Sequence, residues 1–92
     1  MKKLIIQDIL KMVLAEYKCR CLDTKRKRTT DRYALCKNKE GFFYIKIDER
    51  ELEGISDKNK IWFVYESMVK KQLKNKRLFN PLTELREYVN KL

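Results

Sequence analysis

The fold is decided by one stretch, residues 33–48, which reads Tyr33-Ala34-Leu35-Cys36-Lys37-Asn38-Lys39-Glu40-Gly41-Phe42-Phe43-Tyr44-Ile45-Lys46-Ile47-Asp48. Apolar residues alternate along both halves, as expected for strands whose successive side chains point to opposite faces. The polar connection between the halves ends in Gly41, which suits the positive φ of a hairpin loop. We therefore predict two antiparallel strands, at about 32–37 and 42–48.

A weaker strand is predicted upstream, at about 18–22. A long loop, residues 23–31, would join it to the strand at 32–37. The three strands would then form an antiparallel meander with one polar face and one core face. Downstream, residues 48–54 have the pattern of a single helical turn, with Asp48 as its cap and Gly54 beyond its end.

Helical periodicity predicts three helices around this sheet, at 3–17, 57–76 and 81–91. Ser56 is the expected N-cap of the helix at 57–76, and Asn80 is expected to cap the last helix with Pro81 in its first turn. The apolar face of the first helix is predicted to comprise Ile5, Ile6, Ile9, Leu10, Met12, Val13 and Tyr17. The fold class is therefore α+β, in the order α-β-β-β-α-α, and residues 1–92 are predicted to form a single compact domain.

The composition excludes several kinds of chemistry. The 92 residues include no histidine and only two glycines, so a Ser-His-Asp or Cys-His catalytic group and a glycine-rich phosphate loop are both ruled out. We expect no enzymatic activity, no catalytic residues and no cofactor. The sequence has no stretch of about 20 apolar residues and no signal-peptide cleavage pattern, which favours a cytoplasmic protein.

The three cysteines, Cys19, Cys21 and Cys36, favour reduced thiols packed as small apolar side chains. Zinc would need a fourth ligand, so no metal site is expected. A bridge from Cys36 to either of the other two is the remaining alternative.

Charge is the strongest functional signal. The chain has 23 Lys and Arg against 13 Asp and Glu, a net charge of +10. Residues 18–39 hold nine basic and two acidic residues, and residues 70–77 hold five basic residues and no acidic one. Between these two basic blocks lies an acidic turn, residues 48–57, for which a solvated or salt-bridged surface is the favoured interpretation. This arrangement predicts a bipolar surface.

Two candidate interfaces follow from the basic blocks. The first is the predicted loop with Lys25, Arg26, Lys27, Arg28 and Arg32, where adjacent cations and threonines would contact phosphates. A solvated loop that aids solubility is the alternative. The second is the outer arc of the helix at 57–76, which comprises Lys60, Phe63, Lys70, Lys71 and Lys74. An exposed Phe63 would stack on a base or anchor a protein partner; the alternative is that Phe63 packs inside.

Aromatic residues on the predicted sheet offer a third possibility. Phe42 and Tyr44 share one face of their strand and would suit stacking on unpaired bases. Packing of one face into the core, with Tyr44 half exposed, is the favoured alternative.

These observations favour a small, basic, non-catalytic protein that binds nucleic acid, either duplex or structured RNA or DNA. The alternative is a phage or mobile-element inhibitor that docks on a host defence nucleoprotein, such as a CRISPR-type nuclease. The element order over residues 3–76 resembles that of double-stranded-RNA-binding domains. Lys58 and Lys60 match only loosely the lysine cluster at the start of that family's last helix.

Overall fold

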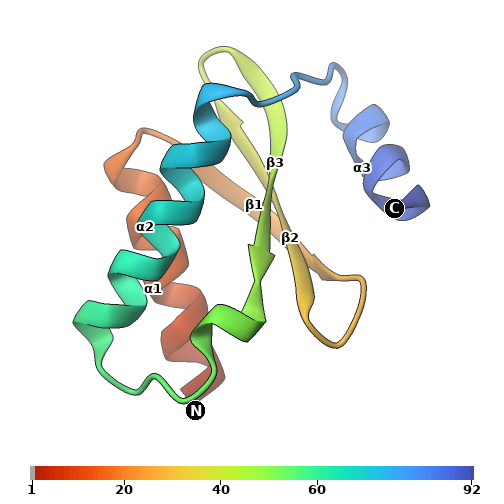
Figure 1. Ribbon diagram of the computed structural model, residues 1–92. Helices are drawn as coiled ribbons and strands as arrows, with labels where there is room; N and C mark the ends of the chain where they lie inside the picture. Colours follow the sequence, from red (N-terminus) through yellow and green to blue (C-terminus); the bar gives the residue numbers. More distant parts are fainter. Residues whose placement is uncertain (1) are drawn as a thin grey trace.

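The computed structural model describes the backbone of residues 2–92 and the side chains of residues 8–92. The elements are α1 (Lys2–Glu16), β1 (Arg20–Arg26), β2 (Asp31–Asn38), β3 (Gly41–Asp48), the 3-10 turn η1 (Glu49–Leu52), α2 (Lys58–Lys74) and α3 (Leu82–Lys91). This is the predicted α+β order. Figure 1 shows α1 and α2 side by side on one face of the sheet and α3 on the other. Within residues 2–92, no helix has the length and hydrophobicity needed to cross a membrane.

The three strands form an antiparallel sheet in the order β1-β2-β3. A two-residue turn joins β2 to β3, because Asn38 pairs directly with Gly41. The Asn38 side-chain oxygen accepts hydrogen bonds from the backbone N–H groups of Glu40 (2.8 Å) and Gly41 (3.2 Å). Gly41 has a φ of 146°, which only glycine adopts readily. The predicted hairpin is confirmed.

The first strand is longer than predicted. It continues past residue 22 to Arg26, whose partner in the ladder is Arg32, and the connecting loop shrinks to residues 27–30. Lys and Arg at the end of an edge strand are compatible with β structure because their side chains reach solvent while the backbone pairs. A β-bulge between Cys21 and Asp23 shifts the register.

The main core lies between the sheet and the helices α1 and α2. The strands contribute Ala34, Cys36, Phe43, Ile45 and Ile47, and the helices contribute Ile9, Leu10, Val13, Leu14, Ile61, Tyr65, Met68 and Val69. Each large apolar side chain stabilises the fold by about 1.5–3 kcal/mol. In α1 the predicted face is partly wrong: Met12 is 54% exposed and Leu14 is fully buried instead. The side chains of Ile5 and Ile6 lie outside the described residues.

The second face of the sheet is not polar, which corrects the prediction. Tyr33 and Leu35 are buried there against Phe79 and against Leu85 and Val89 of α3. An aromatic cluster extends this smaller core: the rings of Tyr44 and Tyr88 stack with centroids 5.8 Å apart, and the rings of Tyr33 and Tyr44 meet edge to face at 5.5 Å. Phe42 packs at the margin of this core and Tyr44 is half-buried in it. The favoured alternative, in which the aromatic face packs into a core and Tyr44 stays half exposed, is therefore confirmed.

Two predicted helix caps are wrong. Asp57, not Ser56, caps α2, and its carboxylate accepts a hydrogen bond from the Asn59 N–H at 2.8 Å. Pro81 occupies the N-cap position of α3 without a side-chain hydrogen bond, so Asn80 is not the cap. The predicted turn at 48–54 is present as η1.

Candidate nucleic-acid interface

The basic segment 25–32 lies at one end of the β1–β2 hairpin and not on a long free loop. Lys25 and Arg26 pair with Tyr33 and Arg32 in the ladder. Their backbones are therefore fixed by the sheet. The predicted long loop is therefore wrong for Lys25 and Arg26, since only residues 27–30 leave the strands, whereas Arg32 lies in a strand as predicted.

Glu49 holds the two arginines of this segment. Its Oε2 lies 3.5 Å from Nε of Arg32, whose side chain is only 17% exposed. Its Oε1 is buried and lies 3.0 Å from Nη2 of Arg26. The two atoms form an ion pair, but their geometry is not that of a hydrogen bond. Arg32 also donates a hydrogen bond to Oγ1 of Thr24 at 3.2 Å. Glu49 therefore offsets one of the two positive charges, and the Arg26 side chain remains 44% exposed.

The two lysines of the segment reach the end of α3. Lys27 Nζ donates to the backbone oxygen of Asn90 at 2.8 Å, and Lys25 Nζ donates to the side-chain oxygen of the same residue. A cation at the last carbonyls of a helix is favourable because those groups are partly negative. Arg28 is exposed and, among the described residues, has no hydrogen bond or ion pair. It is the freest cation of the predicted loop.

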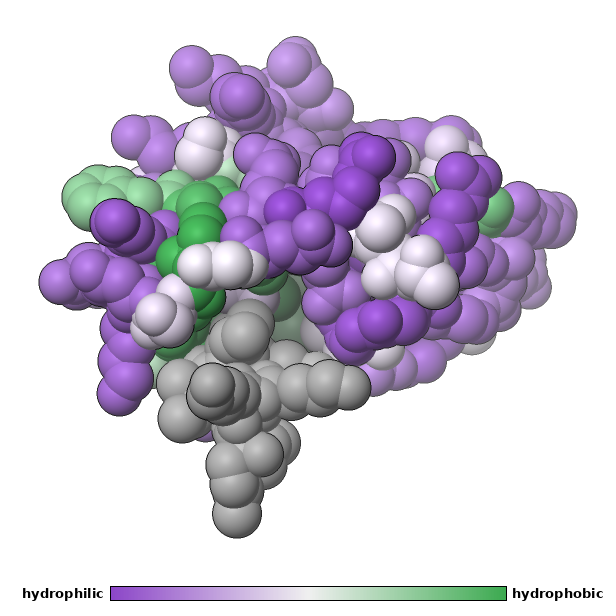
Figure 2. Space-filling view, turned by 60° about the horizontal axis from the view of Figure 1, so that its bottom comes forward, coloured by the Kyte–Doolittle hydropathy of each residue, from purple (hydrophilic) through white to green (hydrophobic). Residues whose placement is uncertain are grey.

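The outer arc of α2 is where the sequence analysis placed it. Lys60, Lys70, Lys71 and Lys74 are all exposed, and none has a hydrogen bond or ion pair among the described residues. Phe63 lies on the same arc with 68% of its surface exposed, which excludes the alternative that it packs inside. We call these five residues the α2 ridge. Seen from the lower end of Figure 1, the surface is mostly hydrophilic with one compact hydrophobic area (Figure 2).

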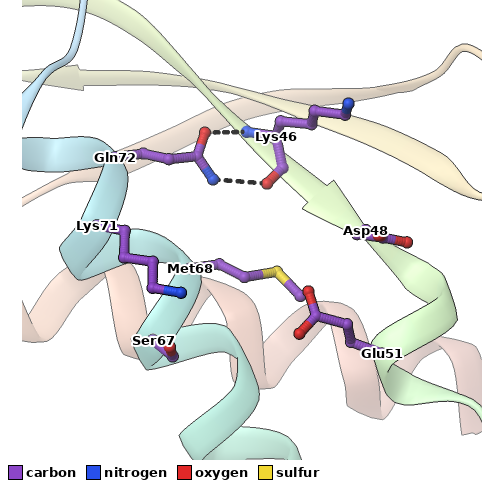
Figure 3. A pocket seen from close by; sticks show the side chains of 7 residues that line it. All are labelled: Lys46, Asp48, Glu51, Ser67, Met68, Lys71 and Gln72. Atoms are coloured by element: carbon purple, nitrogen blue, oxygen red, sulfur yellow. Dashed lines mark hydrogen bonds between the residues drawn. The ribbon is translucent and has the colours of Figure 1, made fainter.

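A groove runs beside the ridge, between the C-terminal half of α2 and the outer edge of β3. Gln72 bridges it: the side-chain amide accepts from the Lys46 N–H at 2.8 Å and donates to the Lys46 C=O at 2.7 Å (Figure 3). This bridge satisfies two backbone groups of the edge strand. It also divides the groove into two hollows, and Lys71 and Gln72 line both of them.

The first hollow, about 280 Å³ in volume, has mixed charge. Figure 3 shows its lining: Lys46, Asp48, Glu51, Ser67, Met68, Lys71 and Gln72. Asp48 caps η1 and forms an ion pair with Arg50 at 2.9 Å, and this hydrogen-bonded guanidinium lowers the pKa of the Asp48 carboxyl. The lining thus places two carboxylates, one of them paired with Arg50, beside two lysines.

The second hollow, about 290 Å³ in volume, has cations and no carboxylate in its lining. The lining consists of Tyr44, Lys71, Gln72, Asn75, Lys76 and Arg77. Lys76 is tied to Glu40 at 2.9 Å and is mostly shielded from solvent; that ion pair lowers the pKa of Glu40. Lys71 and Arg77 are exposed. We call this space the Tyr44 hollow.

Aromatic rings fix Arg77 in place. The guanidinium carbon lies 4.9 Å from the ring centroid of Phe79 and 4.9 Å from that of Tyr88. Contact with two π faces holds the planar group. Burial among these rings raises the pKa of Tyr44, and the nearby Tyr88 raises it further. The Tyr44 hydroxyl therefore stays neutral beside the cation at neutral pH.

The acidic turn and the cysteines offer no second site among residues 8–92, where no group of three or more Cys, Asp or Glu side chains could hold a metal ion. Glu49 and Asp48 serve the ion pairs described above. The thiols of Cys19, Cys21 and Cys36 are free. Cys21 and Cys36 face one another across β1 and β2, and burial raises the pKa of both thiols.

Sequence reasoning missed the Tyr44 hollow as a unit. Arg77 belongs to the basic block 70–77, but nothing local to the sequence places it beside Tyr44. The juxtaposition depends on Phe79, which forms a bridge with Phe42 through two backbone hydrogen bonds of 2.7 and 3.4 Å. Two features of the sequence point to parts of this hollow: the spacing of the aromatic residues in β3 and the basic block 70–77.

Comparison with known proteins adds no relative. No family model, no curated protein and no solved structure matches the chain. The resemblance to double-stranded-RNA-binding domains therefore remains one of element order, and the functional argument depends on the geometry described above.

Proposed function

We propose that the protein is a small non-catalytic protein that binds nucleic acid through phosphate contacts, chiefly from the α2 ridge. The observation that carries this proposal is that the four ridge lysines are exposed and unneutralised along one helix face, with Phe63 between them. A row of free cations binds a polyanion because each contact releases condensed counterions.

The hairpin end has a smaller part in this proposal than the sequence predicted. Arg26 and Arg32 share the single carboxylate of Glu49, and Lys25 and Lys27 contact Asn90, so each of these four side chains already has a partner within the fold. Arg28 remains free to add a phosphate contact. The sequence also lacks histidine, the side chain best suited to general acid–base chemistry near neutral pH, which supports a binding role.

The test is a fluorescence anisotropy titration with labelled RNA and DNA oligonucleotides at several NaCl concentrations. We expect log K to fall linearly with log salt. Replacing Lys60, Lys70 and Lys74 together with Gln should reduce that slope by about 2–3 and weaken binding by about 10-fold or more. The matched control is Lys11→Gln, Lys39→Gln and Lys91→Gln, which removes the same charge from exposed lysines elsewhere.

Two outcomes would overturn the proposal. One is that the wild-type protein binds none of the oligonucleotides. The other is that the ridge variant and the control variant bind equally well, which would show that binding depends on net charge and not on the position of the lysines. In the first case, a partner that survives nuclease treatment in a pull-down would point instead to a protein target.

A further inference from the structure

We propose that the Tyr44 hollow holds an unpaired strand of nucleic acid, with a phosphate between Lys71 and Arg77 and a base against Tyr44. This inference rests on the proposed function and goes further, because it names the form of nucleic acid and the place where the strand lies. Four features of the described residues support it, and the first is charge.

The two hollows beside the Gln72 bridge differ in the charges that line them. The hollow lined by Lys46 also contains Glu51, which repels phosphate, and Asp48, which is paired with Arg50. The Tyr44 hollow has no carboxylate in its lining, and its one shielded cation, Lys76, is already neutralised by Glu40. A phosphodiester is therefore favoured on the Tyr44 side of the bridge alone.

The second feature is the fixed guanidinium of Arg77. Its two ring contacts, each 4.9 Å, favour one position of the group before any ligand arrives. The guanidinium has five N–H donors and a fork that matches two phosphate oxygens. Lys71, on the last turns of α2, provides a second, mobile cation that lines the same hollow. Together the two cations are suited to hold one phosphate.

The third feature is an aromatic surface within the hollow. Tyr44 is half-buried, lines the hollow and stacks on Tyr88 with an interplanar angle of 24°. A nucleobase in the hollow would contact the part of Tyr44 that remains exposed and would add to this aromatic cluster. In a duplex the base faces are already covered by neighbouring bases, so only an unpaired strand can use this surface.

The fourth feature is the set of neutral polar groups beside the ring. Asn75 lines the hollow together with Tyr44, and an amide side chain can both donate to and accept from the edge of a base. The Gln72 amide lines it too, but its oxygen and nitrogen are already engaged by the Lys46 backbone. An unpaired base exposes its Watson–Crick edge, which pairing covers in a duplex. The hollow therefore combines a phosphate contact, a stacking surface and an edge contact at the scale of one nucleotide.

The test compares a labelled single-stranded oligonucleotide with the same strand in a perfect duplex, by anisotropy at one fixed NaCl concentration. We expect the single strand to bind about 10-fold more tightly. Arg77→Gln should weaken single-strand binding by about 10-fold and duplex binding much less. Arg77→Lys keeps the charge and should recover only part of the loss, because the fork and the ring contacts are gone. Lys39→Gln is the control.

A second pair of variants tests stacking. Tyr44→Leu should reduce single-strand affinity by about 10-fold, whereas Tyr44→Phe should retain it because the ring remains. Thermal melting by circular dichroism checks that both variants fold. Equal affinity for single strand and duplex, or an Arg77→Gln variant that binds as Lys39→Gln does, overturns the inference. If binding still depends on the α2 ridge in that case, the proposed function stands and only the place of the strand is wrong.

Discussion

At the residue scale, Glu49 shows how the fold accommodates its excess of positive charge. A single carboxylate lies between Arg26 and Arg32, which face the same side of neighbouring strands and would otherwise repel. Arg32, with only 17% of its side chain exposed, depends on this partner, whereas the pair of the 44% exposed Arg26 contributes about 0–1 kcal/mol. These two arginines therefore act in structure, and the α2 ridge provides the cations free to bind.

Tyr65 gives a pH-dependent prediction at the same scale. Burial raises the pKa of Tyr65 to about 12, and the nearby Glu49 raises it further. The unfolded chain releases this proton near pH 10, so between about pH 10 and 12 the free energy of unfolding falls as pH rises. Tyr65→Phe should lack this component, and its loss of stability across that range should be smaller by at most about 3 kcal/mol.

Urea unfolding followed by Trp62 fluorescence at about pH 9 and pH 11.5 measures this difference. Other groups that titrate in alkali are common to both proteins and cancel in the comparison. Parallel pH profiles for the wild type and Tyr65→Phe would contradict the prediction.

At the element scale, α3 is held by a small core of its own. Leu85 and Val89 are fully buried, and the rest of the contact consists of aromatic rings and the two lysine contacts to Asn90. Leu85→Ala removes a large part of that core and should cost about 2–5 kcal/mol. The loss should appear first as opening of α3, because α1 and α2 share the other core.

Hydrogen exchange measured by mass spectrometry tests this prediction. Amides of α3 should exchange faster in Leu85→Ala, while amides of α2 keep their protection. Leu92→Ala, which removes a 43% exposed side chain near the same helix, is the matched control. Equal loss of protection in α2 and α3 would show that the two cores unfold together and would contradict the prediction.

The elements that the sequence predicted well are those with local signals. The hairpin around Gly41 and the periodicity of α2 depend on residues close in sequence, and both were placed within a few residues. The end of β1 was missed because a run of Lys and Arg resembles a loop, while an edge strand tolerates it. The packing of α3 on the second face of the sheet was missed because the burial of Tyr33 and Leu35 depends on α3, some fifty residues downstream.

At the scale of the whole molecule, the net charge of +10 leads to a prediction about stability. Like charges gathered in a compact state repel, and added salt screens that repulsion over a Debye length of about 10 Å at 0.1 M. We expect the thermal midpoint to rise by a few degrees between about 0.05 and 0.5 M NaCl, since the exposed ion pairs that salt weakens contribute about 0–1 kcal/mol each.

Differential scanning calorimetry provides the measurement. The variant Lys11→Gln, Lys39→Gln and Lys91→Gln carries three fewer charges and should show a smaller rise. A midpoint that falls with salt in both proteins would contradict the prediction, because attractive ion pairs would then outweigh repulsion.

The bridge between Gln72 and Lys46 also bears on how the protein behaves when crowded. A polyanion gathers many copies of a basic protein along its length, which is the situation in which open strand edges recruit one another and seed fibrils. On the outer edge of β3, an amide side chain already pairs with Lys46 and the backbone of Phe79 already pairs with Phe42. The edge next to the proposed binding surface is thereby a poor template for aggregation.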